Sequence, residues 1–304
     1  MERDDLRERR VYSDPTLPID LYTIHGRGFL MGAHWHPDLE ILYVESGSVL
    51  FTMDGAKVSA EAGSAVLANP GTLHTAETLG IGEARFHAVV FDVALLSGSV
   101  PDACSLRYLD PLREDRLRLP LLVSGATPQE ADSLDRCREL VAVLQTRPRG
   151  YELRVKSLLF GWLAGFVADD ALARPESRGA PGLPAEWRRR TDSARIEPVK
   201  KSLELLHERY SGRVTVAELA GVANLSEFHF FRVFKEATGR SPIEYLNEYR
   251  CRRAAEKLLE TDADILGIAL DSGFSSAGYF IRVFRRYYGR TPSSYRRRKA
   301  DPLG

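Results

Sequence analysis

The C-terminal third of the chain repeats one pattern of apolar positions. Residues 219–245 and residues 268–295 align along most of their length, with one extra residue in the second copy. In the second half of each copy, apolar residues follow the i, i+3, i+4, i+7 spacing that predicts the buried stripe of an α-helix. These residues are Phe230, Val233, Phe234 and Ala237 in the first copy and Phe280, Val283, Phe284 and Tyr287 in the second. An internal repeat of this kind indicates two copies of one structural unit.

Capping and turn residues divide each copy into two short helices. Thr215 and Glu218 have the spacing of a capping box, which predicts the start of the first helix. Asn224 and Gly273 lie where this helix must stop, and both residue types tolerate a left-handed backbone. The second helices are expected to begin and end at further serines and glycines: Ser226, Ser275 or Ser276, Gly239 and Gly289. We therefore expect helix-turn-helix units at residues 216–237 and 265–287.

The opposite face of each second helix is left for solvent or for a partner. It combines arginine with aromatic and small side chains. This mixture suits a helix in the major groove of DNA, where arginine reaches guanine and apolar atoms reach the thymine methyl group. The candidate DNA-binding residues are Glu227, Phe228, His229, Phe231, Arg232 and Lys235 in the first copy and Ser276, Ala277, Gly278, Tyr279, Ile281, Arg282 and Arg285 in the second. The alternative is a pair of helical hairpins with a basic, solvated face.

A single helix is expected between the two copies. Residues 242–259 contain no glycine, and their only proline stands at the first position. At about 1.5 Å per residue this helix would be roughly 27 Å long, comparable to the ~34 Å between successive major-groove faces on one side of a duplex. A stiff spacer of this length would let one chain reach two neighbouring segments of the groove.

The motifs that close the two copies resemble those of a known family. The segments RVFKEATGRSPIEY (residues 232–245) and RVFRRYYGRTPSSY (residues 282–295) are similar to the duplicated DNA-binding domain of the AraC/XylS family of bacterial transcription regulators. The resemblance implies that Arg232 and Arg282 contact the groove. It also implies double-stranded promoter DNA and RNA polymerase as partners, and activation as the usual output. Gly278 has no side chain for hydrogen bonding, so the second unit is expected to act mainly through phosphates.

The N-terminal part of the chain has short apolar runs separated by turn residues. Strands are expected at residues 41–45, 49–53, 65–68 and 86–91, and Asp54-Gly55 is a strong hairpin signal. Short strands at close spacing argue for a small antiparallel barrel or sandwich. The predicted fold class is therefore multidomain. It has an N-terminal all-β barrel with following α-helices and a C-terminal all-α domain of two helix-turn-helix units.

Ionisable residues are expected inside this barrel. His34, His36 and Glu40 have the spacing of the first cupin motif. His74 follows a Pro-Gly turn, as in the second cupin motif, although this segment has one residue more than usual. The N-terminal part thus resembles a cupin domain. Because residues two and four apart on a strand share a face, we expect the first three side chains to point into the barrel together.

Three interpretations of this cluster are open. Three imidazoles and a carboxylate could hold a divalent transition-metal ion. The same groups could bind a small polar effector, with Trp35 or Tyr43 offering an aromatic face to a sugar. They could also be hydrogen-bonded structural groups. The family resemblance favours an effector, most often a sugar or related carbon source, and no cofactor or metal is predicted. The expected effector-binding residues are His34, Trp35, His36, Glu40, Tyr43 and His74.

The competing function is that of an enzyme. A metal-dependent cupin could act as an isomerase or dioxygenase, with the helical region as an accessory. Its metal ligands would then be His34, His36, Glu40 and His74. The sequence contains no glycine-rich phosphate loop, nucleophile elbow or Cys-x-x-Cys pair. We therefore predict a regulator without catalytic residues.

Two helices are expected between the barrel and the DNA-binding units. Residues 128–144 and 151–167 have helical spacing, and the second helix is apolar on more than one face. Such a helix either belongs to the core or pairs with a second copy of the chain, and we expect a homodimer. The predicted layout is a cupin-like domain at 1–100, a helical dimerisation region at 101–170, a flexible linker at 171–195 and the DNA-binding domain at 196–300.

The distribution of charge agrees with this layout. The formal net charge is zero, yet residues 196–304 have 19 Lys and Arg against 14 Asp and Glu, a net charge of +5, which leaves −5 for residues 1–195. The three cysteines have no pair spacing for a metal site or a disulfide. The charged N-terminus does not resemble a secretory signal, and the longest apolar run, residues 158–168, is shorter than the ~20 residues of a membrane span. A cytoplasmic protein with no membrane partner is expected.

Overall fold

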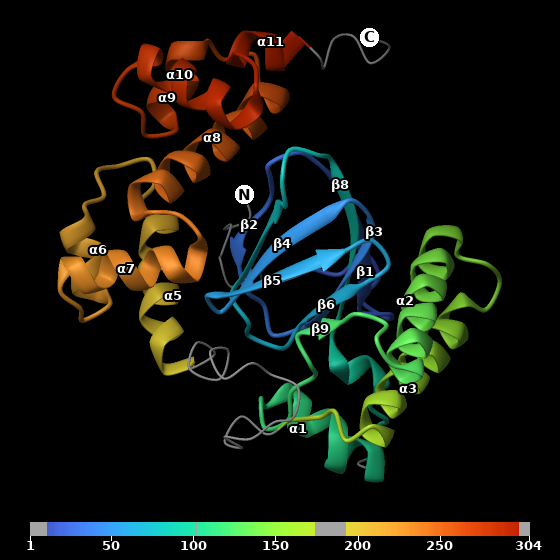
Figure 1. Cartoon of the computed structure of the whole chain (residues 1–304). Helices are drawn as coiled ribbons and strands as arrows, with labels where there is room; N and C mark the ends of the chain where they lie inside the picture. Colours follow the sequence, from blue (N-terminus) through green and yellow to red (C-terminus); the bar gives the residue numbers. More distant parts are fainter. Residues whose placement is uncertain (1–10, 101, 174–192, 298–304) are drawn as a thin grey trace. The chain divides into compact units, whose positions relative to one another are not determined.

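The computed structural model describes residues 11–100, 102–173 and 193–297 (Figure 1). Within these ranges the chain forms two compact units, an N-terminal unit that ends at residue 173 and a C-terminal unit that starts at residue 193. The first is built on two antiparallel sheets and the second is helical, which confirms the predicted fold class. Most of the predicted linker, residues 171–195, lies outside the described residues.

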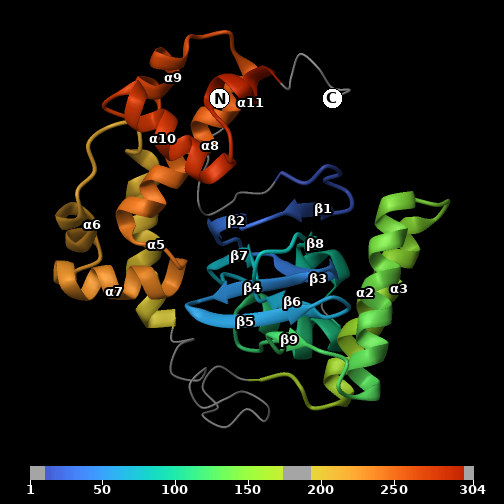
Figure 2. The same ribbon diagram turned by 45° about the horizontal axis from the view of Figure 1, so that its top comes forward.

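Two antiparallel sheets form the N-terminal unit (Figures 1 and 2). The five-stranded sheet has the order β1-β8-β3-β6-β9 and the four-stranded sheet the order β2-β7-β4-β5. The bounds are β1 Ile19–Gly26, β2 Phe29–His34, β3 Leu39–Ser46, β4 Ser48–Met53, β5 Ala56–Glu61, β6 Ala65–Ala68, β7 His74–Thr78, β8 Ala84–Phe91 and β9 Leu122–Val123. The predicted hairpin joins β4 to β5, with Asp54 at φ 49° and Gly55 at φ 85°.

The two sheets share an apolar core. The ring of Phe51 on β4 packs edge-on against that of Phe86 on β8, with 5.4 Å between their centroids. Leu42 and Val44 of β3 belong to the same core, and neither is exposed to solvent. Aromatic and branched side chains from alternating positions thus fill the space between the sheets.

Two helices cover the outer face of the five-stranded sheet (Figure 2). Helix α2 (Pro128–Thr146) packs against β3 and against helix α3 (Tyr151–Ala168), and both helices share a core with Leu39 and Ile41, which alternate along β3 with the residues that face the inner core. Strand β3 is therefore buried on both faces. Three short segments precede these helices: η1 Val93–Leu96, η2 Ser105–Leu109 and α1 Asp110–Arg113.

Helix α3 buries one face and leaves two large apolar side chains outside. Val155, Leu159 and Trp162 are almost completely buried against the sheet and α2. Leu153 is 78% exposed and Phe160 is 39% exposed. The core accounts for most of the apolar character of this helix, and only these two side chains are left for the predicted self-association.

The C-terminal unit consists of helices (Figure 1). Their bounds are α5 Ser193–Glu208, α6 Val216–Val222, α7 Glu227–Thr238, α8 Pro242–Glu260, α9 Ile265–Asp271, α10 Ala277–Tyr288 and α11 Pro292–Arg297. Helices α6 and α7 form the first pair, and α9 and α10 form the second. Helix α8 connects them and packs against α7 on one side and α9, α10 and α11 on the other.

Candidate nucleic-acid interface and candidate ligand site

Helix α7 forms the first candidate DNA-binding surface. Ser226 caps its N-terminus, and Gly239 ends it with φ 72°. Asn224, at φ 53°, makes the turn from α6, as the sequence predicts. Phe230 and Phe234 are completely buried against the rest of the unit. Because these two rings fix the inner face of the helix, the opposite face must point outward.

The outward face of α7 exposes two aromatic rings. Phe228 is 85% exposed and Phe231 is 43% exposed, and Arg232 beside them is exposed as well. Large apolar side chains gathered on a surface commonly mark an interaction site. The other candidates on this helix are also exposed: Glu227, His229 and Lys235.

Helix α10 has the same kind of N-cap and buried phenylalanines as α7, but its exposed side chains differ. Ser276 is its N-cap, which decides between the two serines considered, and Phe280 and Phe284 are completely buried. Ala277 is partly buried and leaves little surface for a partner. The exposed candidates are Ser276, Gly278, Ile281, Arg282 and Arg285. This helix therefore offers positive charge but few groups that distinguish bases.

Tyr279 is held within the unit. Its hydroxyl accepts a hydrogen bond from Nδ2 of Asn247 on α8 at 2.9 Å, and its ring centroid lies 6.0 Å from that of Phe274. The guanidinium of Arg282 lies 5.3 Å from the same ring. Helical spacing placed Tyr279 among the DNA-binding candidates, but its described contacts hold α10 on α8. The sequence offered no signal for Asn247, because the two residues are 32 positions apart.

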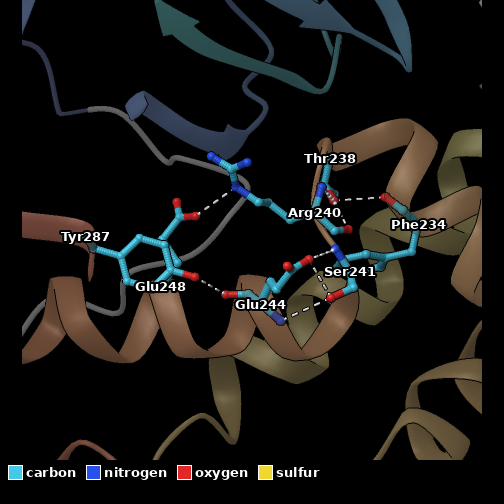
Figure 3. A network of polar contacts seen from close by, with 7 residues as sticks. All are labelled: Phe234, Thr238, Arg240, Ser241, Glu244, Glu248 and Tyr287. Carbon is cyan, nitrogen blue, oxygen red and sulfur yellow. Dashed lines mark hydrogen bonds and ion pairs between the residues drawn. The ribbon is translucent and has the colours of Figure 1, made fainter. Parts of the chain in front are cut away.

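A network of polar contacts joins α7 to α8 (Figure 3). The hydroxyl oxygen of Thr238 lies 2.8 Å from the carbonyl oxygen of Phe234 and 3.0 Å from that of Arg240, and these two acceptors share its single hydrogen. Ser241 and Glu244 form a capping box at the start of α8. The end of α7 and the beginning of α8 are thus fixed within a few residues of each other.

The same network attaches α8 to α10 (Figure 3). The hydroxyl of Tyr287 on α10 donates to the carbonyl oxygen of Glu244 on α8 at 3.0 Å. On α8 itself, Glu248 accepts a hydrogen bond from Nε of Arg240 at 3.3 Å. Burial, the largest of several influences, raises the pKa of Tyr287 to about 12, so its hydroxyl keeps the proton that it donates. With 19 residues, α8 is about 28 Å long. The outward faces of α7 and α10 are therefore joined by a stiff helix.

The ionisable cluster of the N-terminal unit is assembled from both sheets. His34 at the end of β2 and His74 at the start of β7 are direct neighbours in the four-stranded sheet. Glu40 lies on β3 of the five-stranded sheet, and His36 lies in the connection between β2 and β3. His34, His36 and Glu40 meet as the sequence predicts, but they do not lie on one strand, because the chain crosses between sheets after His34. The side chains meet because the sheets face each other.

The four side chains lie in contact. Their ligand atoms are all within 4.8 Å of one another. Nε2 of His36 and Nε2 of His74 lie 2.9 Å and 2.8 Å from the same carboxylate oxygen of Glu40. These three residues are buried, whereas His34 is partly exposed. The structure therefore brings together the four residues that the sequence singled out as possible metal ligands.

Burial and mutual charge shift the pKa values in this cluster. Burial, followed by the charge of His74, holds the pKa of His34 well below its ordinary value. Burial acts to raise the pKa of Glu40, but His74 and His36 outweigh it and hold this pKa well below its ordinary value. Burial acts to lower the pKa of His74, but Glu40 outweighs it and raises this pKa. The carboxylate of Glu40 is thus ionised beside the imidazoles.

The aromatic residues expected beside the cluster are arranged differently. Tyr43 is three residues after Glu40 on β3, so its side chain lies on the opposite face, in the core with α2 and α3. Its hydroxyl accepts a hydrogen bond from Nε of Arg138 at 3.4 Å. The strand alternation removes Tyr43 from the predicted effector site. Trp35 is 6% exposed and lies between His34 and His36 in the chain.

Two family models match the chain. The AraC-like ligand binding domain matches residues 17–163, and a helix-turn-helix domain matches residues 219–298. Together with the fold, these matches define a DNA-binding transcription regulator with a ligand-binding domain. The chain belongs to the AraC family of transcription regulators. This membership supports the predicted regulator over the cupin enzyme considered as the alternative.

Curated relatives agree with this assignment. The uncharacterised HTH-type transcriptional regulator YdeC of Bacillus subtilis is 23% identical over 266 residues, which are 87% of this chain and 85% of YdeC. The probable transcription factor PqrA of Proteus vulgaris is 34% identical over 107 residues, which are 35% of this chain and 87% of PqrA.

Two solved structures align with the chain at low TM-scores. The DNA-binding domain of AdpA in complex with a target DNA is 29% identical, with a TM-score of 0.33, and covers 35% of this chain and 98% of that one. ToxT of Vibrio cholerae, bound to an unsaturated fatty acid, is 15% identical, with a TM-score of 0.44, and covers 95% of this chain and 97% of that one. Among the described helices of the present chain, none combines the length and apolar character required to cross a membrane.

Proposed function

We propose that the C-terminal unit binds double-stranded promoter DNA by placing α7 and α10 in successive segments of the major groove. Helix α7 would read bases through Phe228, Phe231 and Arg232. Helix α10 would bind mainly phosphates through Arg282 and Arg285, because its first turn has small side chains. The stiff helix α8 would set the distance between the two contacts.

The observation that supports this proposal best is the contrast between neighbouring phenylalanines of α7. Phe230 and Phe234 are completely buried, whereas Phe228 and Phe231 are exposed beside Arg232. Exposure of these aromatic rings to water does not stabilise the folded chain. In a major groove, the rings can contact thymine methyl groups while the guanidinium binds guanine. Glu227, His229 and Lys235 would complete this surface.

We further propose that the N-terminal unit binds a small-molecule effector at the cluster of His34, His36, Glu40 and His74, with Trp35 nearby. A sugar was expected from the resemblance, and an aromatic face beside the cluster would support it. Tyr43 does not provide that face, because it lies on the other side of β3. The nitrogen and oxygen atoms of the cluster therefore indicate the chemistry of its ligand better than the aromatic residues do.

The remaining parts of the proposal follow from family membership. The regulator would act in the cytoplasm, pair as a homodimer and activate transcription together with RNA polymerase. The exposed Leu153 and Phe160 of α3 would contribute apolar surface to the dimer. An effector would change DNA affinity if it binds more tightly to one arrangement of the DNA-binding units than to another. The change in DNA-binding free energy cannot exceed this difference in effector-binding free energy.

Selection of binding sequences from a random duplex pool with the full-length chain tests DNA recognition. Arg232→Ala should weaken binding to the selected sequence by about 1–3 kcal/mol, because it removes a contact with a base. Lys57→Ala removes an exposed positive charge from the N-terminal unit and serves as the matched control, for which unchanged affinity is expected. No enrichment of any sequence, or equal affinities of the two variants, would overturn the proposal.

A further inference from the structure

Each imidazole of the N-terminal cluster is held by a backbone carbonyl group. The distances from Nδ1 to the carbonyl oxygen are 2.9 Å for His34 and Gly32, 3.1 Å for His36 and Asp38, and 2.8 Å for His74 and Thr72. A carbonyl oxygen can only accept, so Nδ1 is the donor in all three pairs. In the neutral ring, Nε2 then has a free lone pair.

The other ring nitrogens converge on one point together with a carboxylate. Nε2 of His36 and of His74 both contact Glu40, and all four ligand atoms are within 4.8 Å of one another. A carboxylate only accepts, so the 2.9 Å hydrogen bond between Nε2 of His36 and Glu40 needs a proton on that nitrogen; when the ring is neutral, its Nε2 and the carboxylate are both acceptors. Nε2 of His74 is buried and makes no regular hydrogen bond among the described residues, although it lies 2.8 Å from the carboxylate of Glu40. A buried group of acceptors is stabilised when a cation lies among them.

We propose that this cluster binds one divalent first-row transition-metal ion through Nε2 of His34, His36 and His74 and the carboxylate of Glu40. Bonds of about 2.1 Å place neighbouring ligand atoms about 3 Å apart and opposite ones about 4 Å apart, which fits the contacts in the cluster. Imidazole and carboxylate ligands suit zinc, cobalt, nickel, iron and manganese, whereas calcium and magnesium prefer oxygen ligands.

The arrangement around the ligands also suits a metal. Histidines that bind metals commonly donate their other ring hydrogen to a carbonyl or carboxylate group, which fixes the ring and the tautomer. All three imidazoles here have such a partner in the backbone. Because backbone carbonyls of the β2–β3 and β6–β7 regions orient the rings, the site is formed before any ion enters. His34, the one partly exposed ligand, marks the side from which an ion would enter.

The occupant that competes with a metal is a proton. If His36 and His74 are protonated, they form ion pairs with Glu40 and the cluster needs no metal. The ion would be part of the proposed effector site, and its binding does not depend on the proposed DNA recognition, because its ligands lie in the other compact unit. Loss of metal binding and loss of operator binding are thus separate results.

Cobalt(II) titration of the untagged full-length chain, stripped with a chelator, tests the proposal. We expect one equivalent per chain with micromolar or tighter affinity, visible absorption bands typical of nitrogen ligation, and a rise in melting temperature. His34→Ala and Glu40→Gln should each weaken binding at least tenfold. His25→Ala is the matched control, because His25 is exposed on β1 outside the cluster, and it should bind like the wild type.

The wild-type titration alone can overturn the proposal. Binding well below one equivalent, or no visible bands, would assign the cluster to proton-mediated ion pairs. Equal affinity in His34→Ala, Glu40→Gln and the wild type would place the ion elsewhere. Far-UV circular dichroism of the metal-free variants shows whether they fold. If His34→Ala does not fold, His34→Gln replaces it, and the same tenfold loss is expected.

Discussion

The two candidate sites depart from the usual distribution of side chains in opposite directions. In the N-terminal unit, three buried ionisable residues and a partly exposed histidine meet between two sheets, where apolar side chains normally lie. In the C-terminal unit, two phenylalanines of α7 face solvent, where polar side chains normally lie. A buried polar cluster indicates a small charged ligand, and an exposed aromatic pair indicates a large partner that covers it.

The largest difference is expected between two adjacent phenylalanines. Phe230→Ala should lower the free energy of unfolding of the C-terminal unit by about 3–5 kcal/mol, because it leaves a cavity in the core. Phe231→Ala should change it by less than about 1 kcal/mol, since its ring is partly in solvent. Urea denaturation followed by far-UV circular dichroism measures both.

The same pair of variants separates packing from recognition. Phe231→Ala should fold normally and bind the selected DNA more weakly. A full loss of stability in Phe231→Ala, with DNA affinity unchanged relative to folded protein, would show that α7 buries this ring against another part of the chain. Both faces of α7 would then be buried, and the exposed face would not be available for DNA.

A smaller difference is expected between the two recognition arginines. Arg232→Ala should reduce the preference for the selected sequence by about 1–3 kcal/mol. Arg282→Ala should weaken binding to selected and random DNA alike and lower the slope of log affinity against log salt by about one, as expected for loss of a phosphate contact. Titrations at several salt concentrations distinguish the two. An unchanged slope in Arg282→Ala would contradict the phosphate role of α10.

A further effect concerns a buried histidine outside both sites. Burial, then the charges of Arg252 and Arg253, hold the pKa of His207 well below its ordinary value of 6.5. The unfolded chain therefore binds a proton below about pH 6.5 while the folded chain does not. Stability is full above this pH and falls by about 1.4 kcal/mol per pH unit below it, until the folded pKa is reached.

Comparison with His207→Gln isolates this effect. Nε2 of His207 lies 3.1 Å from the hydroxyl of Tyr245, and glutamine can keep a hydrogen bond to that group. Melting temperatures measured from pH 7.5 to pH 5 should fall more steeply for the wild type than for the variant. Parallel curves would show that His207 is protonated in the folded chain.

Much of the C-terminal unit was predictable from short-range patterns. The capping box at Thr215, the turn at Asn224 and the helix end at Gly239 all occur where the sequence places them. Each depends on contacts within about four residues, so a short stretch of sequence contains all the necessary information. The buried stripe of Phe230 and its neighbours has the same local origin.

The N-terminal cluster was predictable as a list of residues but not as a geometry. The cupin-like spacing named His34, His36, Glu40 and His74, and the structure brings them together. The side chains meet from two sheets and not from one strand, and Tyr43 lies on the far side of β3. A strand pattern shows which residues share a face but not which sheet the next strand joins.

The sequence by itself determined the duplicated helical pairs, the helix ends and the outward position of Arg232 and Phe228, because helical periodicity and capping act over one or two turns. Tertiary structure decided that Glu40 meets the histidines across two facing sheets and that Asn247 binds the hydroxyl of Tyr279. Those contacts join residues that the chain brings together only when whole sheets and helices pack, so no local pattern of side chains contains them.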